Sequence, residues 1–154
     1  LEFHKDGANE ILRYQRSHAT PSAASNLTVD SVQLYTYAQV DGAEGQARFI
    51  IDNGAPHSQL SPRFIAAFPS VTANARHEAV TIEGGAGAET QADGLVVPTL
   101  NLHFAGTPVT LSEMRVFDDH KTERVGNIGL DVLQSHGGYV LDFGAMRFEL
   151  LPAL

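Results

Sequence analysis

The most constraining feature of this sequence is a short apolar strand that runs directly into an acidic turn. Residues 49–55 read FIIDNGA, so three apolar residues are followed at once by Asp52, Asn53 and Gly54. Aromatic and β-branched residues favour a strand. The segment therefore predicts one carboxylate delivered from the end of a buried strand into a tight turn. Because burying a carboxylate is costly unless it has partners, such a group is usually kept for chemistry.

Taken alone, the same segment has a plainer interpretation. Asn-Gly at positions 53–54 is typical of a type I′ hairpin turn. An Asp-x-Gly sequence by itself is therefore weak evidence for a site, and the functional interpretation depends on the rest of the chain.

Composition excludes several classes of function. The 154 residues include 10 basic and 18 acidic ones, a net charge of -8, which argues against a nucleic-acid partner. The chain has no Cys, so disulfides and thiolate metal sites are excluded, and its seven His are scattered without an H-E-x-x-H pattern. We therefore expect no metal site and no cofactor. The length fits one domain, and 43% hydrophobic residues suffice for its core.

The chain divides into a polar beginning and a strand-rich body. Residues 1–26 are predicted to be an N-terminal arm or linker, partly disordered, in which Ile11, Leu12 and Tyr14 form the apolar side of a short helix. Residues 27–154 form the domain. No apolar run approaches the ~20 residues of a membrane span, so we expect any leader or membrane anchor to lie upstream.

The body predicts many short strands separated by glycine-containing turns. Helices are expected over 62–68, where Ser61 is the N-cap and Pro62 the first residue, and over 130–136. A charged loop is expected over 118–123. This pattern predicts a mainly β, closed or barrel-like fold. The expected strands are 32–40, 47–51, 80–83, 90–97, 100–104, 109–111, 115–117, 139–143 and 147–150.

Four segments together resemble the retropepsin-like aspartic proteases. Residues 52–55 resemble the D-T/S-G-A active-site loop, and 57–64 resemble its continuation into a short helix. Residues 127–133 (NIGLDVL) are similar to the hydrophobic-hydrophobic-Gly element, and 139–150 to the closing strand pair. These segments occur in family order and frame residues 27–150. The resemblance implies a closed, barrel-like acid-protease half with one or two short helices and a flap hairpin.

The resemblance also assigns roles to individual residues. It implies that Asp52 is the catalytic carboxylate and that Ile128 and Gly129 support the active-site loop. The other positions of the active-site loop are Asn53, Gly54 and Ala55. The flap, which would contact substrate, consists of Glu83, Gly84, Gly85, Ala86 and Gly87. A phosphate-binding role for the flap glycines is disfavoured, since no Lys-Ser/Thr follows them.

One Asp implies two chains. Aspartic proteases use two carboxylates that share one proton, because two like charges this close cannot both ionise. The sequence shows no internal repeat, and we expect Asp52 to be the only Asp in an Asp-x-Gly-Ala sequence after an apolar strand. A two-fold homodimer would therefore supply the second catalytic carboxylate. The predicted function is an aspartic endopeptidase that acts on proteins or peptides. We expect an exported, periplasmic bacterial protein.

Two departures from the family pattern leave an alternative open. Asn53 stands where the family has Thr or Ser, and Asn127 replaces a hydrophobic residue. The alternative is a catalytically weak or inactive member that binds peptides as a regulatory module. Four other polar residues are predicted to have structural roles. His57 is expected to pack against its neighbours, and Ser58 to provide a hydroxyl in a turn. Asp131 is expected to place a negative charge in the first turn of its helix, and Asp142 to be structural.

Overall fold

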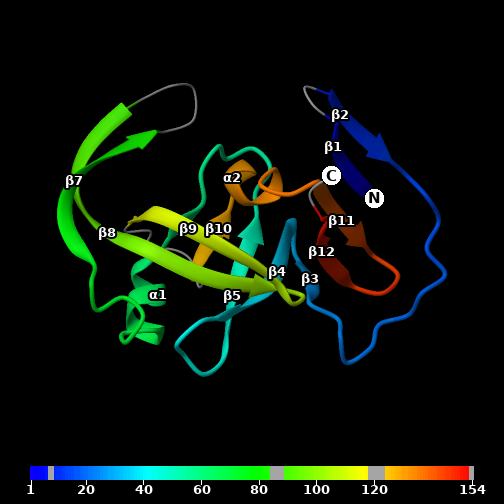
Figure 1. The fold of residues 1–154 in the computed structure, drawn as a ribbon, viewed down its shortest axis with the longest axis horizontal. Helices are drawn as coiled ribbons and strands as arrows, with labels where there is room; N and C mark the ends of the chain where they lie inside the picture. Colours follow the sequence, from blue (N-terminus) through cyan, green and yellow to red (C-terminus); the bar gives the residue numbers. More distant parts are fainter. Residues whose placement is uncertain (7–8, 84–88, 118–123, 153–154) are drawn as a thin grey trace.

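The computed structural model describes residues 1–6, 9–83, 89–117 and 124–152, and this part of the chain is mainly β (Figure 1). It contains twelve strands and two short helices, α1 (Pro62–Ala67) and α2 (Leu130–Leu133). The strands are β1 (Glu2–Asp6), β2 (Asn9–Arg13), β3 (Leu27–Asp30), β4 (Gln33–Val40), β5 (Gln46–Ile51), β6 (Gln59–Leu60), β7 (Arg76–Glu83), β8 (Glu89–Phe104), β9 (Thr107–Val116), β10 (Gly126–Ile128), β11 (Gly138–Asp142) and β12 (Arg147–Leu150).

Eight strands form a sheet that curls back on itself. Their order is β3-β4-β5-β10-β6-β9-β8-β7, and an additional pairing of β4 with β8 joins strands from distant places in that order. In this pairing Ala38 lies opposite Phe104 and Val40 opposite Leu102, and all four are buried. The buried aromatic side chains Phe49, Phe64, Phe104 and Phe148 belong to one hydrophobic core, to which both sheets contribute. The predicted mainly β, barrel-like fold is confirmed.

A second, four-stranded sheet has the order β12-β11-β1-β2. Phe3 of β1 stacks on Tyr139 of β11, with ring centroids 4.4 Å apart, and burial raises the pKa of the tyrosine. The short helix expected around Ile11, Leu12 and Tyr14 is wrong, because these residues belong to β2 or follow it. Leu12 lies opposite Phe3, so pairing with β1 outweighs the weak local helical pattern.

Several predicted boundaries are also corrected. The two strands expected over 90–104 form one strand, β8, which continues through Pro98. Proline is tolerated there because position 98 has no paired residue in either neighbouring strand: β7 begins opposite Val96, and the register with β9 passes from Val97 to Thr99. Likewise, 109–111 and 115–117 belong mainly to one strand, β9. The helix expected over 130–136 ends at Leu133, because the chain turns back to accept a hydrogen bond from Lys5 N–H at the Gly137 carbonyl.

Other predicted elements are confirmed within the described residues. The helix after Ser61 spans Pro62–Ala67, and β11 pairs with β12 around residues 144–145. None of the helices that the structure describes is long and apolar enough to cross a membrane.

Candidate active site

Asp52 follows the last residue of β5, in the middle of the large sheet. β5 lies between β4, its antiparallel neighbour, and β10, which runs parallel to it with Ile128 opposite Ile51. The Asp52 N–H donates to the Ile128 carbonyl at 2.9 Å, which extends this pairing by one residue. The chain then turns, because Ala55 N–H donates back to the Asp52 carbonyl at 3.2 Å. β10 therefore fixes where the turn begins.

The Asp52 side chain is half-buried and closes the turn. Its Oδ1 accepts a hydrogen bond from Gly54 N–H at 3.1 Å. Within one chain a Cβ on Gly54 would meet this oxygen at 3.4 Å, an ordinary contact. A requirement for small residues at positions 54 and 55 would come from the close approach of a second chain, and we state it as a prediction.

Gly129 lies directly against the 52–58 loop, the candidate active-site loop. A Cβ at this position would be 2.6 Å from the Ala55 carbonyl oxygen and 2.8 Å from the His57 carbonyl carbon. Leu130 N–H donates to the same Ala55 oxygen at 2.9 Å. Because both obstacles are backbone atoms, only glycine lets the segment before α2 pack this closely.

A second set of hydrogen bonds, between the 52–58 loop and the start of α2, was not predicted from the sequence. Asp131 accepts hydrogen bonds from Ser58 N–H at 2.8 and 2.9 Å and from the Ser58 hydroxyl at 2.6 Å. Ser58 Oγ in turn accepts the Gly129 N–H at 2.9 Å. The sequence suggests only a turn hydroxyl and a helix-terminal acid, and no local pattern links residues 73 positions apart. Together these bonds hold the 52–58 loop to the start of α2.

Asp52 opens into a groove of about 720 Å³. The groove is lined by the 52–59 segment except Asn53, by Asp131, which is bonded to that segment, and by four consecutive residues of β9, Ser112–Arg115. Asn53 is not among the lining residues of this groove. It lines a separate hollow of about 320 Å³ together with residues of β1, β2 and α2. Adjacent residues of the active-site loop thus contribute to two different cavities.

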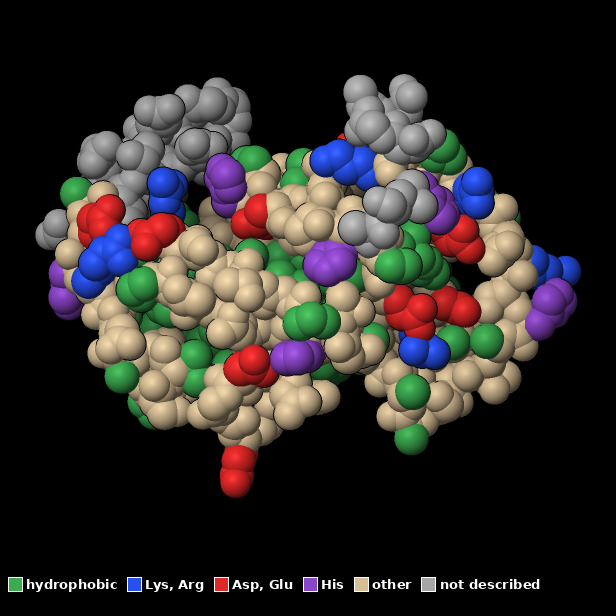
Figure 2. Space-filling model, in the orientation of Figure 1, with side chains coloured by type: hydrophobic (Ala, Val, Ile, Leu, Met, Phe, Trp, Pro, Cys, Tyr) green, Lys and Arg blue, Asp and Glu red, His purple; other side chains and the backbone are tan. Residues whose placement is uncertain are grey.

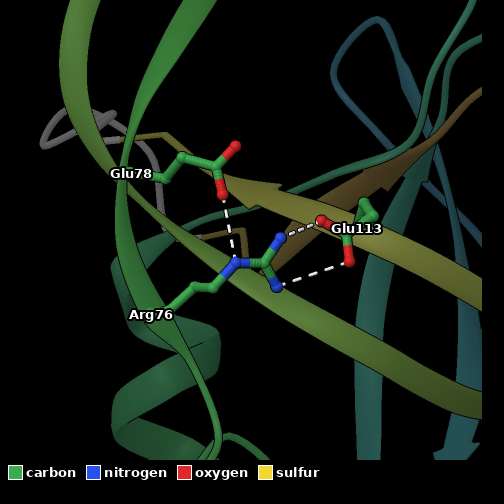
Figure 3. A network of polar contacts seen from close by, with 3 residues as sticks. All are labelled: Arg76, Glu78 and Glu113. Atoms are coloured by element: carbon green, nitrogen blue, oxygen red, sulfur yellow. Dashed lines mark hydrogen bonds and ion pairs between the residues drawn. The ribbon is translucent and has the colours of Figure 1, made fainter.

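A network of charges lies at the groove wall. Arg76 of β7 donates through both terminal nitrogens to Glu113 of β9 and through Nε to Glu78 at 3.0 Å (Figure 3). The bond to Glu113 is the main cause of the raised pKa of Arg76. Glu113 lines the groove and has a φ of 55°, a conformation rarely found for residues other than glycine. The network ties β7 to the groove wall across β8, and Figure 2 shows charged side chains gathered at this end of the molecule.

The predicted flap falls partly outside the described residues. β7 and β8 form an antiparallel hairpin in which Glu83 lies opposite Glu89. Gly84, Gly85, Ala86 and Gly87 lie between them, beyond the residues that the structure describes. In Figure 1 the hairpin rises on the same side of the molecule as α2.

The expectation that Asp52 alone has an Asp-x-Gly-Ala setting is wrong. Residues 142–145 read DFGA and also follow an apolar strand. Here Asp142 Oδ1 accepts hydrogen bonds from Gly144 N–H at 2.9 Å and Ala145 N–H at 3.0 Å. The Ala145 bond and one from Ser17 hold the pKa of Asp142 below its ordinary value. Asp142 lines a third hollow that does not include Asp52, and its role is to close the β11–β12 turn.

No family model matches this sequence, and neither does any curated protein. Solved structures do resemble the fold, and two of them illustrate the likeness. The retroviral protease-like domain of Ddi1 from Leishmania major has a TM-score of 0.54 at 17% identity, covering 81% of this chain and 96% of that one. A retropepsin-like aspartic protease from Rickettsia conorii has a TM-score of 0.53 at 15% identity, covering 77% and 83%. The chain therefore has the retropepsin-like fold, as its sequence predicts.

Proposed function

We propose that this protein is an aspartic endopeptidase whose catalytic pair consists of Asp52 from two copies of the chain. The observation that carries the proposal is the position of Asp52. Its carboxylate stands at the end of a central strand and opens into a groove of about 720 Å³. The turn that holds it packs on Gly129, and the fold is that of retropepsin-like domains.

The need for a second copy follows from the other carboxylates of the groove. Among the described lining residues these are Glu113 and Asp131. Glu113 is paired with Arg76, and Asp131 is held by Ser58. Each of these carboxylates is thus held by a partner other than Asp52. A two-fold dimer that brings the two 52–55 turns together supplies an equivalent carboxylate by symmetry.

The proposed mechanism follows from the charge of such a pair. Two carboxylates ~3 Å apart retain one proton between them, because both cannot be ionised. The ionised member removes a proton from a water molecule, which attacks the peptide carbonyl, while the protonated member donates to the carbonyl oxygen. The two titration steps belong to the pair. An extended peptide in the groove would pair its backbone with strand edges, as in β-augmentation.

Asn53 supports a second candidate function. Its side chain is exposed and carries an amide where the family pattern has a hydroxyl. An amide is longer and presents two donors as well as an acceptor, so it bonds a partner loop differently. A chain with a poorly formed pair would bind peptides in the same groove without cleaving them, as a regulatory module.

The deciding experiment compares two Asp→Asn variants, at the two positions of the chain that share the Asp-x-Gly-Ala pattern. Cleavage of an unstructured protein is measured from about pH 3 to pH 7, across the range in which a carboxylate pair holds one proton. Asp52→Asn should reduce kcat/KM by at least ~1000-fold, because both roles of the pair are lost. Asp142→Asn, the matched control, should retain activity.

Comparable cleavage by wild type and Asp52→Asn would overturn the assignment. Binding of the same protein without cleavage by wild type would favour the regulatory module instead.

A further inference from the structure

Asn53 and Gly54 form the one Asn-Gly pair of the sequence, and both residues are exposed. A side-chain amide followed by glycine is open to attack by the next peptide nitrogen, because glycine has no Cβ to crowd that nitrogen. Asparagine counts among the thermolabile residues of proteins. Thr or Ser, which the family pattern has at position 53, carries no amide and does not react in this way.

The reaction at such a pair consumes only water. The Gly54 nitrogen bonds to Cγ of Asn53, its proton leaves with the side-chain amine as ammonia, and a cyclic succinimide remains. Water then opens the ring. Cleavage of the bond from nitrogen to Cγ gives aspartate, and cleavage of the bond from nitrogen to the main-chain carbonyl gives isoaspartate, in which the backbone runs through Cβ. Either product places a new carboxylate next to Asp52.

The Asp52 side chain restrains the attacking nitrogen. Gly54 N–H donates to Oδ1 of Asp52 at 3.1 Å, so the proton that has to leave is held by a carboxylate. A negative charge this close also disfavours the deprotonated nitrogen. Loss of this hydrogen bond is therefore part of the barrier to ring closure.

The backbone of the turn is a second restraint. Ala55 N–H donates to the Asp52 carbonyl at 3.2 Å, and neither Asn53 nor Gly54 is among the described residues with a positive φ. These features are typical of a type I turn rather than the type I′ turn that Asn-Gly alone suggests. Ring closure has to rotate the peptide between residues 53 and 54 toward the Asn53 side chain, which breaks this geometry.

We propose that Asn53 is a site of spontaneous deamidation and that the Asp52 carboxylate controls its rate by holding the Gly54 N–H. While the turn is closed, the modification is slow. When the turn opens, the Gly54 nitrogen is free to attack. This role of Asp52 depends on neither a substrate nor a second chain.

The modification also affects catalysis, and this consequence rests on the proposed function. A carboxylate at position 53 adds a like charge beside a pair that already shares one proton. An isoaspartate lengthens the chain between the Asp52 carbonyl and the Ala55 N–H that bonds to it, which displaces the catalytic carboxylate. Peptidase activity should therefore fall in step with the deamidated fraction, whereas Asn53→Ser should retain the activity with which it starts.

The first experiment follows deamidation of the folded protein in mildly alkaline buffer by peptide mass spectrometry, with fragment masses assigning each change to one position. Asp52→Ala should speed the reaction at Asn53 at least ~10-fold over wild type, because a hydrogen bond to a charged acceptor no longer has to be broken. Asp52→Asn keeps a neutral acceptor and should fall between the two. Asn74, which is exposed and followed by Ala75, is the control within each sample.

The second experiment moves the arrangement to the other Asp-x-Gly-Ala turn, away from the groove. Phe143 is exposed, and Oδ1 of Asp142 accepts the Gly144 N–H at 2.9 Å. Phe143→Asn therefore creates an Asn-Gly pair whose nitrogen is held in the same way, and it should deamidate slowly. Adding Asp142→Ala should speed deamidation at position 143 at least ~10-fold.

The outcomes separate this inference from the proposed function. In urea, where the turn is lost, wild type should deamidate faster at Asn53 than at Asn74; equal rates overturn the site. A folded Asp52→Ala that reacts no faster than wild type overturns control by Asp52, and if this variant is unfolded, the Phe143→Asn pair decides the question.

Faster deamidation in Asp52→Ala, together with a wild type that cleaves no protein, supports the inference and contradicts the proposed function. Undiminished cleavage by fully deamidated protein overturns the effect on catalysis.

Discussion

The tie between Ser58 and Asp131 gives the sharpest test of how the active-site loop is held. Asp131→Ala removes the acceptor of two Ser58 donors, the backbone N–H and the hydroxyl, which lie 2.6–2.9 Å from the carboxylate. Ser58 is buried, so these donors have little access to water after the substitution. Val132 N–H also loses a bond to Asp131 but keeps one to the Gly129 carbonyl.

The expected loss in the free energy of unfolding follows from the number of hydrogen bonds removed. A hydrogen bond to a charged group contributes ~1.5–3 kcal/mol, so two such bonds give an upper range of ~3–6 kcal/mol. Asp131 is only half-buried, which lets water replace part of the loss, so we expect a decrease of about 3 kcal/mol in the free energy of unfolding. Asp131→Asn should cost about 1–2 kcal/mol, because its amide oxygen still accepts one bond.

Urea denaturation at one fixed protomer concentration measures these values, since dimerisation would otherwise change the apparent stability. The matched control is Ser135→Ala, which removes an exposed hydroxyl just beyond the other end of α2 and should change stability by less than ~0.5 kcal/mol. If Asp131→Ala is as stable as this control, the loop is held by backbone packing on Gly129, and the argument from Ser58 is refuted.

Two further predictions concern glycine and pH. Gly129→Ala should destabilise the protein by ~1–3 kcal/mol in the same denaturation assay, because its Cβ would lie 2.6 Å from a backbone oxygen that has little room to move; unchanged stability would show that the loop relaxes freely. Hydrogen bonds from Ala145 N–H and Ser17 hold the pKa of Asp142 below its ordinary value of 3.8, so its carboxylate stabilises the fold above that value, and this contribution is lost as pH falls through the lower, folded-state pKa. Thermal melts should therefore show Asp142→Asn less stable than wild type at neutral pH, with the difference vanishing in acid; a difference independent of pH would contradict this.

Local patterns predicted several elements of the fold. Phe49, Ile50 and Ile51 form the central strand that the apolar run indicates, and Ser61-Pro62 begins a helix where capping chemistry places it. The hairpin around residues 144–145 follows its turn residues. In each case the determining interactions are local, so a single sequence contains them.

Elements fixed by distant partners were missed. β10 is three residues long and exists because it lies between β5 and β6, and its own sequence, Gly-Asn-Ile, has little strand character. β2 was predicted as a helix because its pairing with β1 and the docking of Phe3 on Tyr139 are invisible to a local pattern. The hydrogen bonds between Ser58 and Asp131 were missed for the same reason, since they join segments that are far apart in the sequence.

The two Asp-x-Gly-Ala sequences show what decides whether such a turn becomes a site. After Asp142 the chain folds back onto its own strand, and the carboxylate accepts two N–H groups of its own turn. After Asp52 it cannot fold back, because β5 already has β4 on one side and the parallel β10 on the other. The turn must therefore leave the sheet, and the approach of Gly129 holds it there, with Asp52 facing an open groove. The same four-residue pattern thus closes a hairpin or presents a carboxylate, depending on whether the next place in the sheet is taken.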